Sequence, residues 1–229
     1  IMSALTIISS MATRLLLAEL AGGYRREQGT EVELEAVGGV DAARRVEAGE
    51  AFDVVVLADN VIARLAAQGH LNPSSITPLA RSGVAIAVRA GSPRPEVSSE
   101  EALREAVLAA RSIGYSTGPS GQHLLKVFER WGIAAAIADR IVQAPPGVPV
   151  GGLIVEGKVE LGFQQLSELL HLKGIAVLGP LPPSVQVTTV FSGAVASQAR
   201  QPGLALAMLR EFAGLHHDAL RRRHGMETA

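Results

Sequence analysis

A turn rich in hydroxyl groups and glycines joins an expected strand to an expected helix near the middle of the chain. The turn contains Ser116, Thr117 and Ser120, and Gly121 and Gln122 follow at the start of the helix. The first N–H groups of a helix have no partner inside the helix, and the helix dipole favours negative charge there. The pattern therefore has two interpretations: Ser120 serves only as the helix N-cap, or the whole turn binds an anion.

Polar residues of the same kinds follow two other expected strands. Ser9 ends the first expected strand and Ser10 follows it, and Gln164 and Gln165 directly follow an expected strand in the second half of the chain. Hydroxyls and amides can donate hydrogen bonds to an anion, and an amide can equally cap the next helix. Together with the central turn, these residues form a candidate ligand-binding set.

Three ionisable residues near the ends of expected elements are further candidates. Arg81 begins a long apolar strand and is either a bidentate partner for a ligand carboxylate or a member of a salt bridge. His123 lies three residues into the helix after Ser120, where it is either a catalytic residue or a structural one. Asp59 follows a strand and is expected to cap the next helix.

Several kinds of catalytic and metal site are not expected. Ser120 lacks the G-x-S-x-G frame of a hydrolase nucleophile. The chain has no cysteine, which excludes disulfides, thiolate metal sites and a cysteine nucleophile. No pair of the remaining histidines stands at zinc-ligand spacing beside a carboxylate, so no metal and no cofactor is expected. These histidines are His70, His171, His216, His217 and His224.

Composition and charge narrow the class of protein further. The 229 residues are 48% hydrophobic and 19% charged, which is enough apolar material for a substantial core. The net charge is −1, and no basic stripe interleaved with aromatic residues is present, so a nucleic-acid partner is not expected. No apolar run approaches the length of about 20 residues that a membrane span needs.

Strands and helices are expected to alternate along most of the chain. Apolar runs and period-two patterns predict strands over 5–9, 31–37, 52–57, 82–90, 113–116, 140–143, 159–163, 175–178 and 186–196. Helical spacing of apolar residues predicts helices over 11–27, 40–48, 60–68, 98–110, 120–131, 148–156, 165–172 and 203–223. The alternation indicates parallel sheets with right-handed crossovers.

Two long strands without helices of their own divide this series into two halves. They are residues 82–90 and 186–196, and each follows a complete run of strand–helix units. The predicted fold is α/β with two lobes, each a mixed, mainly parallel sheet flanked by helices, joined by two crossing strands. Residues 1–81 and 191–229 form the first lobe, and residues 82–190 form the second. A ligand cleft between the lobes, closed by a hinge, is expected.

Three segments resemble a known family: LTIISSMATRLLLAEL, VELEAVGGVDAARRVEAGEAFDVVVLADN and VEGKVELGFQQLSEL. They are similar to the molybdate-type solute-binding proteins of ABC transporters, and the resemblance covers nearly the whole chain. It implies the type II periplasmic-binding-protein fold. It also implies that an oxyanion is bound by four parts of the chain. These are the loop after the first strand, the Gly-Gly loop, the loops that open second-lobe helices, and a tyrosine. The matching positions here are Met11, Gly39, Val40, Gly121, Gly147 and Gln165.

Three of these positions depart from the family pattern. Met11 and Val40 stand where the family has serines, and Gln165 stands where it has tyrosine. A tetrahedral oxyanion would lose hydroxyl donors, each worth about 1.5–3 kcal/mol to a charged group. We therefore expect a carboxylate ligand with an apolar side. The turn YSTGPSG also resembles bacterial aconitate isomerases, which implies, as the alternative, isomerisation of an unsaturated polycarboxylate by an allylic proton shift, with His123 as the candidate catalytic residue.

The resemblance also implies partners and a location. A small anion is the expected ligand, and an ABC transporter permease is the expected partner if the protein is exported. The residues around Met2 include no charged segment followed by an apolar signal run. The expected location is therefore periplasmic if a leader was removed and cytoplasmic otherwise.

Overall fold

The computed structural model describes residues 4–229, so the expected start at Met2 lies outside the described residues. The chain divides into two compact units. Unit 1 comprises Ile1–Arg81 and Val190–Ala229, and unit 2 comprises Ser82–Thr189. Two strands, β4 (Thr77–Arg89) and β9 (Thr188–Val195), each carry the chain from one unit into the other.

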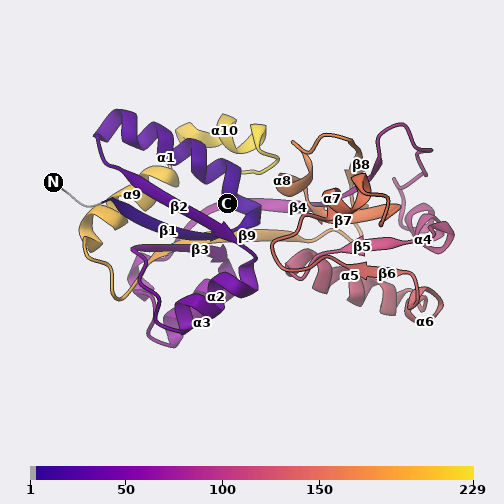
Figure 1. Cartoon of the computed structure of the whole chain (residues 1–229), viewed down its shortest axis with the longest axis horizontal. Coiled ribbons are helices and arrows are strands. Elements are labelled where there is room, and N and C mark those ends of the chain that lie inside the picture. Colours follow the sequence, from indigo (N-terminus) through magenta and orange to yellow (C-terminus); the bar gives the residue numbers. More distant parts are fainter. Residues whose placement is uncertain (1–3) are drawn as a thin grey trace. The chain divides into compact units, whose positions relative to one another are not determined.

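The sheet of unit 1 is parallel except at one strand (Figure 1). β1 pairs in parallel with β2 and with β3, and β9 pairs antiparallel with β3. The elements of this sheet and its helices are β1 (Leu5–Ser10), α1 (Arg14–Gln28), β2 (Val32–Val37), α2 (Gly39–Glu47), β3 (Val54–Ala58), α3 (Asp59–Ala67), β9, α9 (Pro202–Phe212) and α10 (Asp218–Arg223). The short segments Met11–Thr13, Pro73–Ser75 and Leu215–His217 are 3-10 helices.

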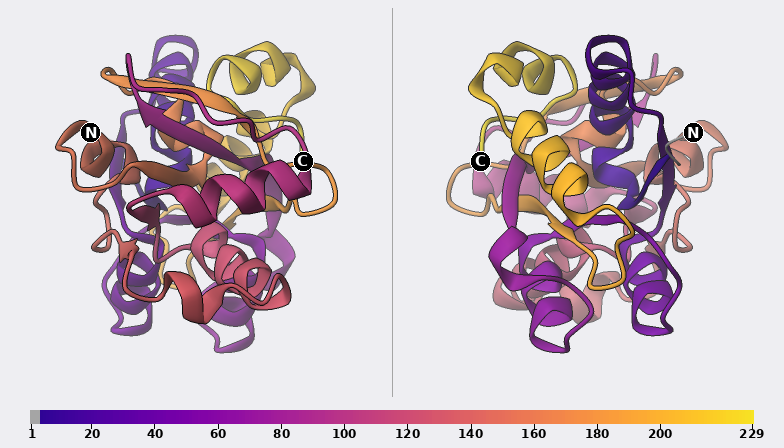
Figure 2. Two further views of the ribbon diagram at one scale, coloured as in Figure 1. Left: turned by 90° about the vertical axis from the view of Figure 1, so that its right-hand side faces the viewer. Right: turned by 90° about the vertical axis from the view of Figure 1, so that its left-hand side faces the viewer.

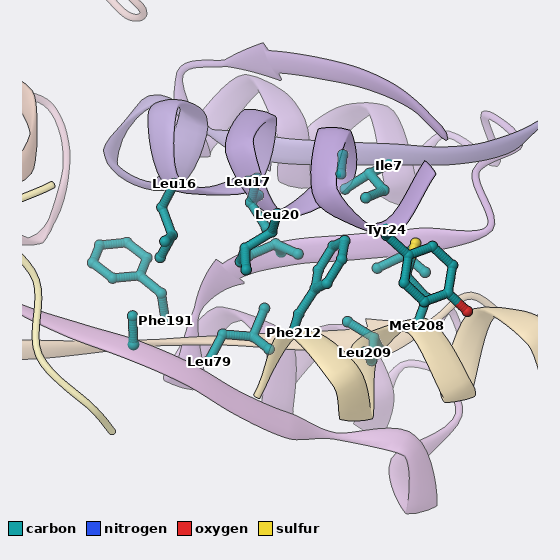
Figure 3. Packing of buried hydrophobic residues seen from close by; sticks show 14 of the residues in the cluster. Ile7, Leu16, Leu17, Leu20, Tyr24, Leu79, Phe191, Met208, Leu209 and Phe212 are labelled. Carbon is teal, nitrogen blue, oxygen red and sulfur yellow. The ribbon is translucent and has the colours of Figure 1, made fainter. Parts of the chain in front are cut away.

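Both faces of this sheet are buried, because alternate residues of β3 serve two different cores. Val54 and Val56 pack with α1 and α9, in the cluster that Figure 3 shows around Leu16, Tyr24 and Phe212. Val55 and Leu57 pack with α2 and α3 in a second cluster. A strand buried on both faces has to be apolar at every position, as the VVVLA sequence of β3 is.

Unit 2 contains a second mixed sheet. Its strands lie in the order β8-β4-β7-β5-β6, in which β5 is parallel to both β6 and β7, and β4 is antiparallel to β7 and β8. Its remaining elements are α4 (Glu100–Ala109), β5 (Ile113–Tyr115), α5 (Pro119–Arg130), α6 (Ala134–Ile137), β6 (Ile141–Gln143), α7 (Val150–Val155), β7 (Leu161–Gln165), α8 (Leu166–Leu169) and β8 (Ile175–Pro180).

The two faces of this sheet carry side chains of different size. Helices α4, α5 and α6 cover the face with the larger residues, and in Figure 2 (left) α4 crosses the front of the view with α6 below it. Helix α7 packs closely on the other face, because that face carries small residues. A Cβ at Gly114 would lie 3.1 Å from Val150 Cγ1 of this helix, and one at Gly162 would lie 2.6 Å from Ile154 Cδ1.

The predicted fold class is confirmed, with corrections to individual elements. The helix expected over 203–223 is wrong, because it ends at Phe212 and the chain resumes in α10 after a 3-10 turn. The buried Arg221 explains the break: its guanidinium binds the carbonyl oxygens of Phe212 and Gly214, which a continuous helix would use itself. Among the described residues, no helix is both long and apolar enough to cross a membrane.

Candidate functional site

Three parallel strands of unit 1 end at one edge of its sheet. β1 ends at Ser10, which stands opposite Val37 at the end of β2, and β3 ends at Ala58. Because parallel strands share their carboxyl edge, the loops that follow lie side by side along it. A Cβ added to Gly39 would lie 3.7 Å from the Cβ of Ser10, which confirms that these two loops touch.

The two serines at this edge differ in their hydrogen bonding. The hydroxyl of Ser9 donates to the carbonyl oxygen of Ser10 over 3.0 Å. The hydroxyl of Ser10 is buried and has no hydrogen-bond partner among the described residues. Leaving a buried hydroxyl unpaired costs about 1–3 kcal/mol, so Ser10 is the residue here that a ligand would satisfy.

The other expected residues of this edge place apolar groups next to Ser10. Met11 begins the short 3-10 helix after β1 and is partly exposed, and the side chain of Val40 is about half exposed. The prediction that Asp59 caps α3 is wrong, because Ala58 is the N-cap of this helix and no side chain caps it. The carboxylate of Asp59 instead accepts a hydrogen bond of 2.6 Å from the buried hydroxyl of Ser192 on β9.

The serine-rich turn of unit 2 folds back onto the end of β5. The hydroxyls of Ser116 and Ser120 lie 3.0 Å apart, and the backbone N–H of Gly118 donates to Ser116 Oγ over 3.2 Å. Gly118 is the N-cap of α5, so the interpretation of Ser120 as the N-cap is wrong. A Cβ at Gly121 would lie 1.8 Å from the Ser116 carbonyl oxygen, so only glycine lets the helix approach β5 this closely. Because one bond joins two hydroxyls, one hydroxyl hydrogen remains free for a further acceptor.

The remaining residues of this turn flank the serine pair. Thr117 is partly exposed and Gln122 is exposed on the first turn of α5. Gly147 lies in the loop after β6 with a φ of 75°, which favours glycine. Since β6 and β5 are parallel, this loop follows the same carboxyl edge of the unit 2 sheet as the serine pair.

The two glutamines that end β7 have different roles. Both polar atoms of the Gln164 amide have partners within unit 2: Oε1 accepts from the Val150 N–H over 2.9 Å, and Nε2 donates to Glu168 Oε1 over 3.1 Å. The Gln165 amide donates from Nε2 to Thr189 Oγ1 over 3.1 Å, and its buried Oε1 has no partner among the described residues. Rotating this amide by 180° keeps the Thr189 contact, with the hydroxyl as donor, and turns the free group into an N–H donor.

Glu168 is an ionisable residue that sequence reasoning did not single out. Burial raises the pKa of its carboxyl to about 7. Its partner Gln164 precedes Gln165, so the carboxyl lies close to the candidate residues at the end of β7. The sequence pattern carried no signal for this pair, because Gln164 lies in β7 and Glu168 in α8, and their contact depends on the turn between the two elements.

Two candidates are held by partners elsewhere in their own units. Arg81 forms an exposed ion pair with Glu227, at 3.1 Å. The Nε2 atom of His123 lies 2.6 Å from the carbonyl oxygen of Val185, so this nitrogen carries its hydrogen and donates it. That bond fastens α5 to the segment before β9 and favours the structural interpretation of His123.

Comparisons with known proteins identify a family and a relative that this chain is similar to. A family model described as bacterial extracellular solute-binding protein matches residues 5–227. An aconitate isomerase from a Pseudomonas species is 32% identical over 215 residues, which cover 91% of this chain and 82% of that protein.

Solved structures with the same arrangement include two anion-binding proteins. The periplasmic molybdate-binding protein of Azotobacter vinelandii superimposes with a TM-score of 0.81 at 18% identity, covering 97% of this chain and 98% of that one. A sulfate-binding protein of Mycobacterium tuberculosis superimposes with a TM-score of 0.77 at 17% identity, covering 98% of this chain and 86% of that one. At such low identity these likenesses show a shared fold alone.

Proposed function

Because this chain belongs to the bacterial extracellular solute-binding proteins, we propose that it binds a small organic anion through its serine hydroxyls and the amide of Gln165. Its fold is the type II periplasmic-binding-protein fold, as the sequence predicts. The observation that carries the proposal is the hydroxyl of Ser10, which is buried at the carboxyl edge of a parallel sheet with no hydrogen-bond partner among the described residues.

The donor chemistry supports a carboxylate ligand. Ser10, the Ser116–Ser120 pair and Gln165 are neutral donors, which suit a carboxylate that shares its charge over two oxygens. Met11 and Val40 add apolar surface to the unit 1 loops and lack the hydroxyls that a tetrahedral oxyanion would use. We therefore favour an anion with carboxylates at one side and hydrocarbon at another.

A second candidate function is isomerisation of an unsaturated polycarboxylate. The 32% identity to an aconitate isomerase favours it. An allylic proton shift needs a general base whose pKa lies near the working pH, and Glu168, with a pKa of about 7, meets that requirement. In this candidate function Glu168 replaces His123 as the proton acceptor, because Nε2 of His123 already donates to Val185.

A binding experiment separates these functions. Calorimetric titration with cis-aconitate, trans-aconitate, molybdate and sulfate is expected to show binding of the carboxylates and weak or no binding of the tetrahedral anions. The exposed Ser74, which hydrogen-bonds to Asn72, provides the Ser74→Ala control, with unchanged affinity. Tight binding of molybdate with no response to either aconitate would overturn the carboxylate assignment.

An activity experiment tests the second function. The protein is incubated with either aconitate isomer, and the isomer ratio is followed by NMR. Isomerisation that is lost in Glu168→Gln but retained in His123→Asn would support catalysis by Glu168. Binding without any change in the isomer ratio would leave solute binding as the function, and an ABC transporter permease is then the proposed partner.

A further inference from the structure

Three side chains at the end of α9 form a cluster that the proposed anion site does not use. Glu211 lies in the last turn of α9, and His216 and His217 lie in the 3-10 turn that follows. The Nε2 atoms of the two histidines lie 2.8 Å and 3.2 Å from Glu211 Oε1. One ligand-type atom from each residue falls within 4.8 Å of the other two. We propose that this cluster binds a divalent transition-metal ion of the Zn²⁺ class.

The donor set favours this class of metal. Two imidazole nitrogens and one carboxylate oxygen suit Zn²⁺ and its neighbours, whereas Ca²⁺ and Mg²⁺ prefer sites made of oxygen alone. Zinc bonds of about 2.0–2.1 Å in a tetrahedron separate the ligand atoms by about 3.3 Å. The histidine–glutamate separations of 2.8 Å and 3.2 Å are close to this value, and all three ligand atoms lie within 4.8 Å of one another, so side-chain adjustments can bring them around one ion. The ion replaces the two hydrogens that the histidines now direct at Glu211.

A buried arginine holds the backbone around the cluster in place. The buried guanidinium of Arg221 donates to the carbonyl oxygens of Phe212 at 2.8 Å, Gly214 at 3.0 Å and Leu79 at 2.7 Å. These bonds fix the turn between α9 and the histidines. A Cβ at Gly214 would lie 2.4 Å from Cε1 of the His216 ring, so a larger residue there would displace this ring. A turn fixed before the ion arrives lowers the entropy that binding has to overcome.

The cluster is also accessible to an ion from solvent. The exposed fractions of the side chains are 35% for Glu211, 60% for His216 and 23% for His217. Water can therefore occupy a fourth coordination position. The sequence pattern missed this cluster, because the pairing of adjacent histidines with a glutamate five residues earlier depends on the break between α9 and α10.

The test is titration of tag-free, chelator-treated protein with ZnSO₄, followed by calorimetry and by thermal unfolding. Wild type is expected to bind one equivalent and to unfold at a higher temperature with zinc than without it. Glu211→Gln and His217→Ala are each expected to weaken binding at least ~10-fold, since each removes a direct ligand. His70→Ala is the control, with unchanged binding, because His70 lies outside the cluster.

Cobalt gives an independent readout. Co²⁺ in a tetrahedral site with nitrogen ligands is expected to produce visible absorption bands in the wild type that are absent in Glu211→Gln. Glu211→Gln keeps the size of the side chain, so it still tests whether this cluster binds the metal ion if His217→Ala fails to fold. Zinc binding that is equally strong in wild type and Glu211→Gln, or absent in the wild type at excess zinc, would overturn the proposal and leave a hydrogen-bonded turn.

Discussion

Ser9 and Ser10 are adjacent serines at the end of β1, yet their hydroxyls have different partners. Ser9 donates to a backbone carbonyl, whereas Ser10 has no partner among the described residues. The local sequence does not indicate which of the two serines would bind a ligand. The direction of each side chain at the strand end decides between them, and it makes Ser10 the stronger candidate.

Replacing Ser10 by alanine is expected to separate stability from binding. Because the hydroxyl is unpaired, Ser10→Ala should leave the free energy of unfolding unchanged or raise it by up to about 1 kcal/mol. The same change should weaken binding of the anion about 10-fold, the loss expected for one hydrogen bond to a charged group. Urea unfolding and calorimetric titration measure the two effects.

Ser9→Ala provides the matched control. It removes a satisfied hydrogen bond and should lower the free energy of unfolding by about 1 kcal/mol. If Ser10→Ala destabilised the protein as much as Ser9→Ala, the assignment of Ser10 as an unpaired ligand group would be wrong.

Glu168 should make stability depend on pH. Its raised pKa means that the folded protein holds a proton which the unfolded chain releases near pH 4.5. The contribution of this carboxyl to stability is therefore full below pH 4.5 and is lost as pH rises to about 7. Since the residue keeps some exposure, the loss amounts to about 1–3 kcal/mol.

Glu168→Gln tests this pH dependence, because the amide does not ionise. Its free energy of unfolding should match the wild type at pH 4 and exceed it at pH 8. Denaturant titrations at the two pH values measure the difference. An equal difference at both pH values would show that the carboxyl does not titrate in this range.

At the scale of elements, the start of α5 depends on one glycine. Gly121→Ala would place a Cβ 1.8 Å from the Ser116 carbonyl oxygen, so the helix would have to move away from β5. We expect a loss of about 2–4 kcal/mol in the free energy of unfolding. The control is Gly118→Ala, where the nearest atom to the new Cβ lies 3.6 Å away and a loss below about 1 kcal/mol is expected. Equal losses in the two variants would contradict this account of the turn.

The break between α9 and α10 depends on Arg221. Arg221→Met would remove the donor from three carbonyl oxygens and should lower the free energy of unfolding by about 3–5 kcal/mol. Arg221→Lys keeps the charge but cannot reach all three acceptors, so an intermediate loss is expected. Thermal unfolding of the two variants and the wild type measures the order of their stabilities. An Arg221→Met variant as stable as the wild type would argue against this role.

At the scale of the whole molecule, each unit carries candidate donors of its own, Ser10 in unit 1 and Gln165 in unit 2. Ser10→Ala and Gln165→Ala are each expected to weaken binding of the anion, while circular dichroism remains unchanged. Ser120→Ala is expected to act in the same direction. Titration of all three variants with one carboxylate tests this, and an effect confined to the variants of one unit would assign the ligand to that unit alone.

Periodicity and spacing were sufficient to predict the fold class. Uniformly apolar runs such as 54–58 indicate strands buried on both faces, and such strands require helices on each side. The alternation of strands and helices then predicts mainly parallel sheets with crossovers, to which the long strands β4 and β9 add antiparallel pairs. The residues that follow the strands were predicted for the same reason, because the carboxyl edge of a parallel sheet collects the loops that end its strands.

The partner of each polar side chain was decided only by the tertiary structure. Nothing in the local sequence shows that both polar atoms of the Gln164 amide have partners, Val150 and Glu168, whereas Oε1 of Gln165 has none among the described residues. The same holds for His123, whose bond to Val185 spans 62 residues. Hydrogen bonds and carboxyl pKa values depend on groups that are distant in sequence and meet only when the chain is packed, whereas strand and helix patterns depend on neighbours along the chain.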